Sequence, residues 1–369
     1  AGVTGRYTLT NGSIAMNLSN NSVSSAFLNL NGNAVSFQNN NNCRIWQADL
    51  FENKVISRIL EINSGLNYRT SNSNQFSFFP AFQTAPSIIP SSQKVNISSV
   101  FTSLFFKNLG GFHLELGGRY NDHSTYGDNF TYTINPSYIF ANKYKFFANV
   151  SSAFKAPTLY QLFSQYGNLD LKPEVTQTYD AGFDFDLFAG KLNVNATAFQ
   201  RITNNNAIYF YSEPVTFKSY YRNGRKQNDK GFELETILKP IQSLSLNAFY
   251  SYVEGELTID ENTKQSDLYR RPKNQFGGTI SYQPVQKITV GVTAKYTGKR
   301  KEQDFRTFPA IIVTNKSYTL VDTYVEASPL KTLTIFADMK NIFNEKYVEW
   351  LGYNTRGFNF NAGLKYNIK

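Results

Sequence analysis

Apolar and polar residues alternate with a period of two along much of this chain, and this alternation restricts its fold more than any other feature. Between residues 288 and 297 every second residue is apolar, and the residues between them are mostly polar. The pattern recurs in segments 244–252, 333–339 and 358–368. Successive side chains of a β-strand point to opposite faces of its sheet. The chain is therefore predicted to be all-β, with one apolar and one polar face.

The hydropathy of the chain excludes one class of membrane protein and permits another. The mean hydropathy is −0.39, and no apolar run approaches the about 20 residues that a membrane helix needs. A helical membrane protein is therefore excluded. A strand of a membrane barrel needs only about 9 to 11 residues and exposes every second one to lipid. Aromatic residues make up 16% of the chain and charged residues only 17%, which suits such a barrel.

Charged residues indicate which face of each strand would meet lipid. Lys295, Asp338, Lys340 and Lys365 all fall on the polar phase of their segments. A lysine on the lipid side near the membrane midplane costs roughly 2 to 4 kcal/mol, so these residues are expected to face the lumen. In a soluble β-sandwich or solenoid, the alternative, the apolar phase would be a buried core instead.

Connections of two lengths alternate along the chain. Short ones rich in Gly and Pro are expected at 108–111, 141–143, 188–190, 240–242, 284–286 and 328–330. Long ones are expected at about 70–94, 155–175, 204–229, 256–272, 300–317 and 342–356, an intermediate one at 121–129, and a loop at the amide run 38–42. This alternation predicts an up-and-down transmembrane antiparallel β-barrel. We expect about 16–18 strands, about nine of them after residue 174, with periplasmic turns and extracellular loops.

One stretch between two alternating segments, residues 154–174, carries a recognisable pattern. It resembles a motif of TonB-dependent outer-membrane receptors, and we expect its residues to have a structural role. Five further motifs, at 118–120, 221–223, 270–272, 298–300 and 341–343, follow in the order that this family shows. The residues that carry the first pattern are Phe154, Ala156, Pro157, Gly167, Asn168, Leu171, Pro173 and Glu174.

The resemblance implies more than the residues show by themselves. Complete receptors of this family have roughly 22 strands around a plug domain, in the outer membrane of Gram-negative bacteria. Residues 1–369 are therefore expected to be the C-terminal part of the barrel domain, with the plug and the first strands missing. TonB, the energy-transducing partner, would contact the missing N-terminal segment. Ile368 stands where family members commonly end in an aromatic residue.

The tail at 347–357, together with segment 298–308 and Phe308-Pro309, is most similar to vitamin B12 (cobalamin) receptors. Cobalamin is a large amphipathic ligand, so its receptor needs aromatic platforms beside amides and hydroxyls. Loop packing or an interfacial girdle is the ordinary role of such aromatic residues. The loop aromatics that are candidates for ligand contact are Tyr160, Phe163, Tyr166, Tyr209, Tyr211, Tyr220, Tyr221, Tyr269, Phe305, Trp350 and Tyr353.

Several other classes of function remain as alternatives. A ferric-siderophore receptor would share every backbone motif. A plug-free passive porin would explain the strands but not the 154–174 motif, and a soluble surface adhesin would not explain exposed apolar faces. No nucleophile elbow, phosphate loop or zinc pattern occurs, so catalysis is not expected.

Partners and ions follow from the remaining residues. The net charge is +10, but the basic residues are scattered, so no nucleic acid is expected; lipopolysaccharide phosphates are one acidic partner that would fit. A surface lipoprotein that caps the loops is another partner that the resemblance allows. We expect no cofactor and no metal, since Cys43 is alone and His113 and His123 lie far from other ligands. Asp180, Asp184 and Asp186 are expected to line the lumen.

Overall fold

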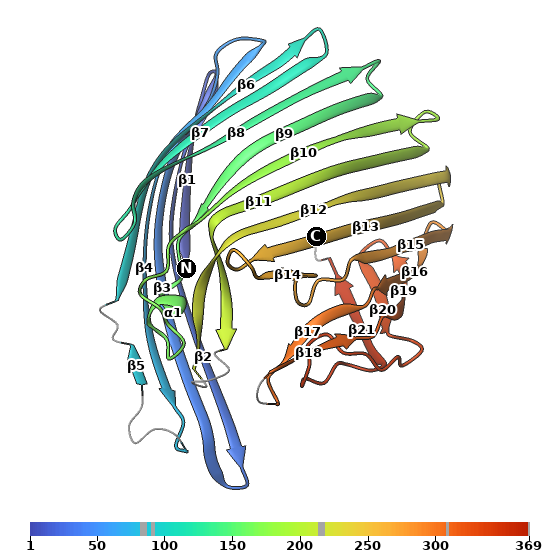
Figure 1. Cartoon of the computed structure of the whole chain (residues 1–369). Coiled ribbons are helices and arrows are strands. Elements are labelled where there is room, and N and C mark those ends of the chain that lie inside the picture. The colour runs from blue at the N-terminus through green and yellow to red at the C-terminus, as the bar shows by residue number, and fades with distance from the viewer. Residues whose placement is uncertain (82–86, 90–92, 213–217, 308–309, 368–369) are drawn as a thin grey trace.

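The protein is built from one large antiparallel sheet that curls into a barrel wall (Figure 1). The computed structural model describes residues 1–81, 87–89, 93–212, 218–307 and 310–367. Within these residues the sheet has nineteen strands, and a separate hairpin has two. Seventeen strands remain when the three-residue strands β5 and β14 are set aside. Nine of them follow Pro173, and both numbers confirm the sequence prediction.

The long strands are β1 (Gly2–Leu9), β2 (Gly12–Asn31), β3 (Ala34–Val55), β4 (Leu60–Phe78), β6 (Lys94–Leu109), β7 (Phe112–His123), β8 (Gly127–Phe140), β9 (Tyr144–Lys155), β10 (Glu174–Leu187), β11 (Leu192–Ser212), β12 (Ser219–Ile241), β13 (Leu244–Thr258), β15 (Asn274–Val285), β16 (Ile288–Thr297), β19 (Tyr318–Leu330), β20 (Leu333–Lys340) and β21 (Asn359–Tyr366). The shorter elements are β5 (Ser87–Ile89), α1 (Leu159–Phe163), β14 (Lys264–Ser266), β17 (Arg300–Asp304) and β18 (Ile311–Asn315).

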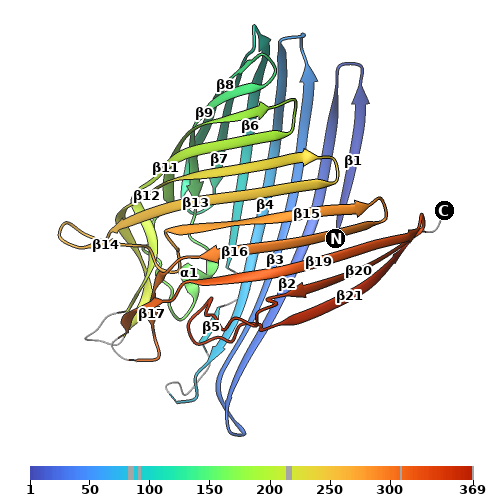
Figure 2. The same ribbon diagram turned by 90° about the vertical axis from the view of Figure 1, so that its right-hand side faces the viewer.

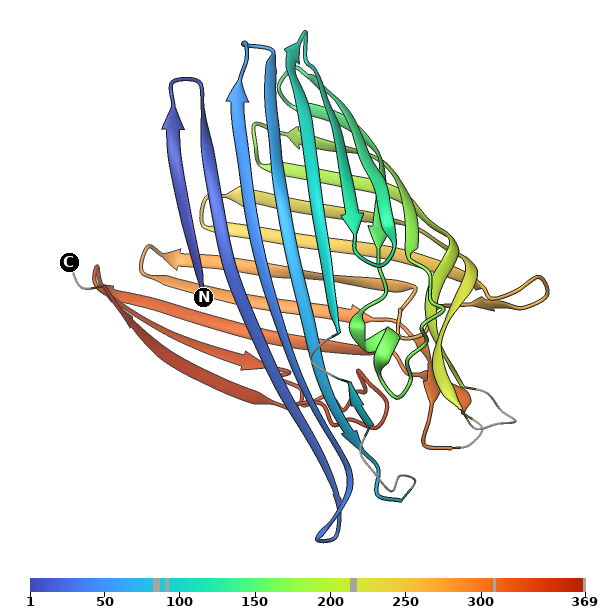
Figure 3. The same cartoon turned by 90° about the vertical axis from the view of Figure 1, so that its left-hand side faces the viewer.

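Each long strand pairs with the next one along the chain, from β1–β2 through to β20–β21. This is the predicted up-and-down order. No ladder joins β1 to β21 within the described ranges, so the wall is open between these two strands (Figure 3). The sheet nevertheless curls as the wall of a barrel does.

The two faces of the sheet differ as the alternation predicts. On one face large apolar side chains are exposed along β16, β20 and β21, among them Val292, Ile335 and Leu364. On the other face the Lys340 ammonium lies 3.5 Å from the Asp322 carboxylate of the adjacent strand and 3.7 Å from that of Asp338. Charges therefore pair on the inner face, and apolar residues meet the membrane on the outer face.

Five phenylalanines on the inner face lie directly opposite glycines of the neighbouring strand. In each pair, a Cβ atom added to the glycine would come within 2.6–2.9 Å of the phenylalanine ring. The rings therefore lie over the glycines, which only a residue without a side chain permits. The pairs are Phe101–Gly65, Phe147–Gly182, Phe199–Gly231, Phe249–Gly277 and Phe336–Gly363.

The two ends of the sheet are built differently (Figure 2). One end carries the short turns, and in three of them the backbone takes positive φ values, at Asn108, Ala141, Asn142, Phe188 and Ala189. The other end carries the long connections, with α1, β5, β14 and the β17–β18 hairpin. The connection expected near 121–129 is only three residues long, because β7 ends at His123 and β8 begins at Gly127.

Two loop predictions were wrong, and a third, 70–94, was wrong over its first nine residues, because β4 continues to Phe78. The amide run 38–42 lies in β3, where its backbone pairs with β2 on one side and β4 on the other. Most of 204–229 is also strand, since β11 continues to Ser212 and β12 begins at Ser219. In both cases cross-strand hydrogen bonds override the turn preference of Asn and Gly. Phe308, Pro309 and Ile368 lie outside the described residues.

Candidate ligand-binding site

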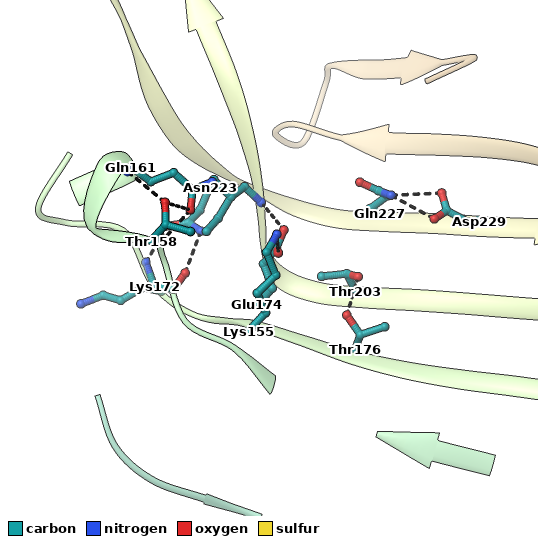
Figure 4. Close-up of polar contacts among 11 residues, drawn as sticks. Lys155, Thr158, Gln161, Lys172, Glu174, Thr176, Thr203, Asn223, Gln227 and Asp229 are labelled. Atoms are coloured by element: carbon teal, nitrogen blue, oxygen red, sulfur yellow. Dashed lines mark hydrogen bonds and ion pairs between the residues drawn. The ribbon is translucent and has the colours of Figure 1, made fainter. Parts of the chain in front are cut away.

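The segment between β9 and β10, residues 156–173, forms a compact structure that we call the motif loop (Figure 4). Its short helix α1 begins with a capping box: Thr158 Oγ1 accepts from the Gln161 backbone N–H, and Gln161 Oε1 accepts from the Thr158 N–H at 2.9 Å. Pro157 comes just before this cap. Gly167 packs against the end of the helix, where an added Cβ would lie 2.4 Å from the Leu162 carbonyl oxygen.

The motif loop is tied to the start of β12. Asn168 Nδ2 donates to the Tyr221 carbonyl at 3.0 Å, and the Tyr221 N–H donates to the Tyr166 carbonyl at 3.0 Å. Asn223 Oδ1 accepts from the Lys172 N–H at 2.8 Å, and its Nδ2 donates to the Lys172 carbonyl at 3.1 Å. Two motifs that lie far apart in the sequence, at 166–172 and 221–223, are therefore in direct contact (Figure 4).

The end of the motif loop is fixed by burial and charge. Leu171 is only 1% exposed, and its carbonyl accepts from the Tyr126 hydroxyl at 3.0 Å. Glu174 accepts from the Ile208 N–H at 2.8 Å and pairs with Lys155 at 2.6 Å. Phe154 packs edge-on near His123, and Ala156 and Pro173 are the first and last residues of the loop. These contacts hold the loop in one position across the ends of β9 to β12.

An aromatic cluster lies on the face of β11–β12 that meets the motif loop. Tyr166 meets Phe210 at 5.3 Å between ring centroids, and Phe210 meets Tyr221 at 5.3 Å and Phe305 at 5.9 Å. Tyr160 lies 6.3 Å from Tyr221. All four contacts are edge-to-face, the geometry that aromatic pairs favour. Sequence reasoning missed Phe210. Its role becomes visible only in the structure, where Phe210 lies directly opposite Tyr221 in the β11–β12 ladder.

The other tyrosines of the β11–β12 hairpin lie on its opposite face. Tyr211 meets Tyr209 at 6.4 Å and Tyr220 at 5.8 Å, and the Arg222 guanidinium lies 4.8 Å from the Tyr211 ring centroid. The candidates predicted as one loop are therefore separated by strand alternation. Tyr221 belongs with the aromatic cluster, whereas Tyr209, Tyr211 and Tyr220 form a second row. This row reaches the motif loop at one end, where Tyr220 lines the same cavity as Tyr166.

A cavity of about 840 Å³ lies between the motif loop, the start of β12 and the end of β4; we call it the tyrosine cavity. Its size falls within the range of small-molecule sites. Burial raises the pKa of Tyr166, so its hydroxyl stays neutral and available as a hydrogen-bond donor. The lining combines three aromatic rings with polar groups and one cation: Phe79, Gln165, Tyr166, Gly167, Lys218, Ser219 and Tyr220.

Trp350 and Tyr353 lie elsewhere, in the connection 341–358 between β20 and β21, which we call the Trp350 loop. The Arg270 guanidinium stacks 3.6 Å from the Trp350 ring centroid and donates to Glu302 Oε1 at 2.7 Å. Glu302 is 1% exposed and also accepts from the Leu351 N–H at 3.1 Å. Tyr353 meets Trp350 at 6.0 Å. This group is built around a buried charge and forms no part of the tyrosine cavity.

A second buried carboxylate supports the same end of the sheet. Asp229 is 1% exposed and pairs with Arg201, with Arg271 at 3.1 Å and with the Gln227 amide. Sequence reasoning missed Asp229 and Glu302 as anchors, although it singled out their partners in the Arg270-Arg271-Pro272 motif. Tyr269, beside them, and Phe163, at the end of α1, are half-buried.

The other polar candidates are held by ordinary hydrogen bonds. Asp180 accepts from Asn149 at 2.7 Å, and Asp184 accepts from Asn193 at 2.7 Å. His123 Nδ1 accepts from the Thr125 N–H at 3.1 Å. No group of three or more His, Cys, Asp and Glu residues could hold a metal ion in the described part of the chain. No helix of the described residues has the length and apolar character to cross a membrane.

Comparisons with known proteins agree on the fold. Residues 1–342 match the family model "TonB dependent receptor-like, beta-barrel". A vitamin B12 transporter, BtuB from Vibrio cholerae, is 28% identical over 262 residues, which cover 69% of this chain and 40% of that protein. The chain thus spans less than half the length of this curated relative.

Solved structures resemble the chain along nearly its whole length. The ferripyoverdine receptor of the outer membrane of Pseudomonas aeruginosa superposes with a TM-score of 0.77 at 16% identity, and the match covers 99% of this chain and 55% of that one. The ferric enterobactin receptor PfeA from the same species gives 0.77 at 17% identity, with 99% and 60% covered. At such low identity these similarities establish the fold alone.

Proposed function

We propose that this chain, which belongs to the family of TonB-dependent receptor β-barrels and lies in the bacterial outer membrane, forms the external binding surface of a receptor for cobalamin or a related corrinoid. The observation that carries this proposal is the 28% identity to a vitamin B12 transporter over 69% of the chain. The tail at 347–357, which resembles the same group of receptors, supports it.

The chemistry of the tyrosine cavity suits such a ligand. Cobalamin offers flat apolar faces and a rim of amides. Tyr166, Tyr220 and Phe79 supply aromatic surfaces, while Gln165 and Ser219 supply hydrogen-bonding groups. Aromatic rings beside a few polar groups are the usual composition of a site for an amphipathic small molecule. Uptake across the membrane would then depend on TonB, the energy-transducing partner of the family.

A ferric-siderophore receptor is the second candidate, and one observation favours it. Lys218 lines the tyrosine cavity, and Arg222 lies over the ring of Tyr211 on the adjoining strand. Cations beside aromatic rings suit a negatively charged iron chelate, whereas cobalamin does not require them. The charge of Lys218 therefore distinguishes the two ligands.

Calorimetric titration of the full-length protein that contains this chain tests the proposal. We expect cyanocobalamin to bind, and Tyr166→Ala and Tyr220→Ala each to weaken binding about tenfold or more through loss of aromatic contact. Tyr282→Ala, at the turn end of β15 and 45% exposed, is the control and should leave binding unchanged.

Lys218→Gln separates the two ligands. A cobalamin receptor should tolerate this change, whereas binding of an anionic ferric siderophore should fall about tenfold. Binding of a ferric siderophore without binding of cyanocobalamin would keep the family and replace the ligand. If the Tyr166→Ala variant bound both ligands with unchanged affinity, the tyrosine cavity would not be the ligand-binding site.

A further inference from the structure

A basic cavity of about 380 Å³ lies where β15 begins and β16 ends. These strand ends lie on the side of the sheet that carries the long loops (Figure 2). We call this cavity the rim cavity. Five of the residues that line it are cationic and one is acidic, and it shares no lining residue with the tyrosine cavity. The charged residues are Arg271, Lys273, Lys299, Arg300, Lys301 and Asp267.

The positive charge of the rim cavity is only partly balanced. Asp267 is shared by Lys273, at 2.6 Å, and Lys301, at 3.1 Å. Arg271 reaches Asp229 beneath the cavity. Lys299 forms no ion pair within the described ranges. One carboxylate thus serves two ammonium groups, and the cavity retains an excess of positive charge that an anion would stabilise.

The rim cavity borders the lipid-facing side of the sheet. Tyr296, which lines it, belongs to the outward phase of β16 and stacks on Phe276 at 4.6 Å. Phe276 is 49% exposed, and Ile280 and Val292 continue the exposed apolar face toward the turn end. Aromatic residues at this level mark the boundary between the hydrocarbon and the headgroups in membrane barrels. The cations therefore lie at headgroup height, just above the aromatic boundary.

Paired charges continue along the rim across the two preceding strands. A smaller cavity of about 300 Å³ has Lys230 and Lys273 in its lining, together with the carboxylates of Glu254, Glu256 and Asp267. Lys230 pairs with Glu254 at 2.9 Å, and the Tyr252 hydroxyl donates to the same carboxylate at 2.7 Å. Tyr252 in turn lies 5.9 Å from Phe232, an exposed aromatic of the outer face. The same order of cation above aromatic ring therefore holds from β12 to β16.

We propose that the rim cavity binds a phosphate group of an anionic glycolipid in the outer leaflet of the membrane. Lysine and arginine are the side chains that recognise phosphate, and each cation at a charged membrane surface adds to the attraction. The exposed apolar residues below the cavity give the acyl chains of the same lipid a surface to pack against. A free phosphate ion would use the cations but not this apolar surface, so the two surfaces together assign the site to a lipid.

Binding of a bisphosphorylated lipid A to the detergent-solubilised full-length protein tests the proposal, with the dephosphorylated lipid measured in parallel. The triple variant K273Q/K299Q/K301Q should bind the phosphorylated lipid at least about tenfold more weakly. The triple variant K191Q/K239Q/K331Q removes the same charge at the turn end and should bind as the parent does. Binding to the parent should weaken as the salt concentration rises.

A single substitution tests whether the triple variant loses binding only because it fails to fold. Lys299→Gln breaks no ion pair of the described residues, so it should fold as the parent does and still weaken binding of the phosphorylated lipid about threefold to tenfold. Equal binding by the parent and the rim triple variant would overturn the proposal, as would an equal loss in the turn-end variant. Displacement of the lipid by millimolar inorganic phosphate would show that the rim cavity binds a free anion, and would overturn its assignment to a lipid.

Discussion

The motif loop and the Trp350 loop are both aromatic-rich connections at the same end of the sheet, yet they are held by different forces. The motif loop is fixed by the buried Leu171 and by neutral hydrogen bonds to Asn223 and Tyr221. The Trp350 loop is fixed by Glu302, a carboxylate that is 1% exposed and bound to Arg270. The motif loop borders an open cavity, whereas the aromatics of the Trp350 loop pack on a charge.

The difference teaches what aromatic residues do in each loop. Trp350 is stacked on Arg270 before any ligand arrives, so one of its two ring faces is already occupied. Tyr166 contacts Phe210 edge-on and still lines the tyrosine cavity. Ligand capture is therefore expected at the motif loop rather than at the Trp350 loop. Four predictions test this comparison.

The largest effect is expected at the buried charge. Glu302→Ala leaves Arg270, Asn315 and the Leu351 N–H without their acceptor, and removing one partner of a buried ion pair costs about 3 kcal/mol or more. Limited proteolysis should then cut the Trp350 loop much faster and leave the motif loop intact. Glu349→Ala, an exposed position in the same loop, is the control. An unchanged cleavage rate would show that the charge does not hold the loop.

Next in size is the hydrophobic anchor of the motif loop. Leu171→Ala creates a cavity at a fully buried position and should cost about 2 to 3 kcal/mol. Hydrogen exchange of the Asn168 N–H, which donates to the Gln161 carbonyl, should speed up accordingly. Leu169→Ala in the same loop is the matched control, since Leu169 is 69% exposed. Equal exchange rates in both variants would contradict the role of Leu171 as the anchor of the motif loop.

A smaller effect is expected at the hydrogen bonds between the motif loop and β12. Asn223→Ala removes both contacts with the Lys172 backbone and should destabilise the docked loop by about 1 to 2 kcal/mol. Asn223→Asp keeps the acceptor for the Lys172 N–H but loses the donor, so it should lie between the parent and the alanine variant. Ligand affinity measured by calorimetry should follow the same order. If Asn223→Asp lost more affinity than Asn223→Ala, the two hydrogen bonds between Asn223 and the Lys172 backbone would not be what holds the loop.

The smallest effect is a difference in acid sensitivity between the two regions. Burial lowers the pKa of His123, the last residue of β7 at the loop end beside the motif loop, below its ordinary 6.5. The folded state therefore takes up a proton less readily than the unfolded state, so the contribution to stability is full above pH 6.5 and is lost as the pH drops from there through the folded pKa. Protonation also removes the Nδ1 acceptor of the Thr125 N–H.

The ion pair near the Trp350 loop should not share this behaviour. Hydrogen bonds from Arg306 lower the pKa of Asp304 to about 2, so its contribution is present above pH 3.8 and is lost only as the pH falls from there through about 2. Between pH 7.5 and pH 5, roughly the range in which histidine titrates, the protection of backbone N–H groups against hydrogen exchange, measured relative to the unfolded chain at the same pH, should therefore fall in the motif loop and stay constant in β17. His123→Gln should abolish this fall. A fall that persists in this variant would assign the acid sensitivity to another group.

Some of the candidate site could be predicted from the sequence. The residues of the motif loop, its Pro and Gly positions and several cavity aromatics stand out locally, because turn chemistry and loop composition are local properties. Phe210, Asp229 and Glu302 could not be predicted in the same way. Each acquires its role from partners on other elements: Phe210 from Tyr166, Asp229 from Arg271, and Glu302 from Arg270.

What the sequence by itself determined is the alternation of faces, the tight turns, the number of long strands and the family. These depend on a period of two and on Gly and Pro positions, which each segment carries alone. Only the tertiary structure decided where strands end and which side chains meet. Residues 38–42 became strand because β2 and β4 pair with them on both sides, and Tyr209 separated from Tyr221 because cross-strand register, not proximity in sequence, sets the face of each side chain.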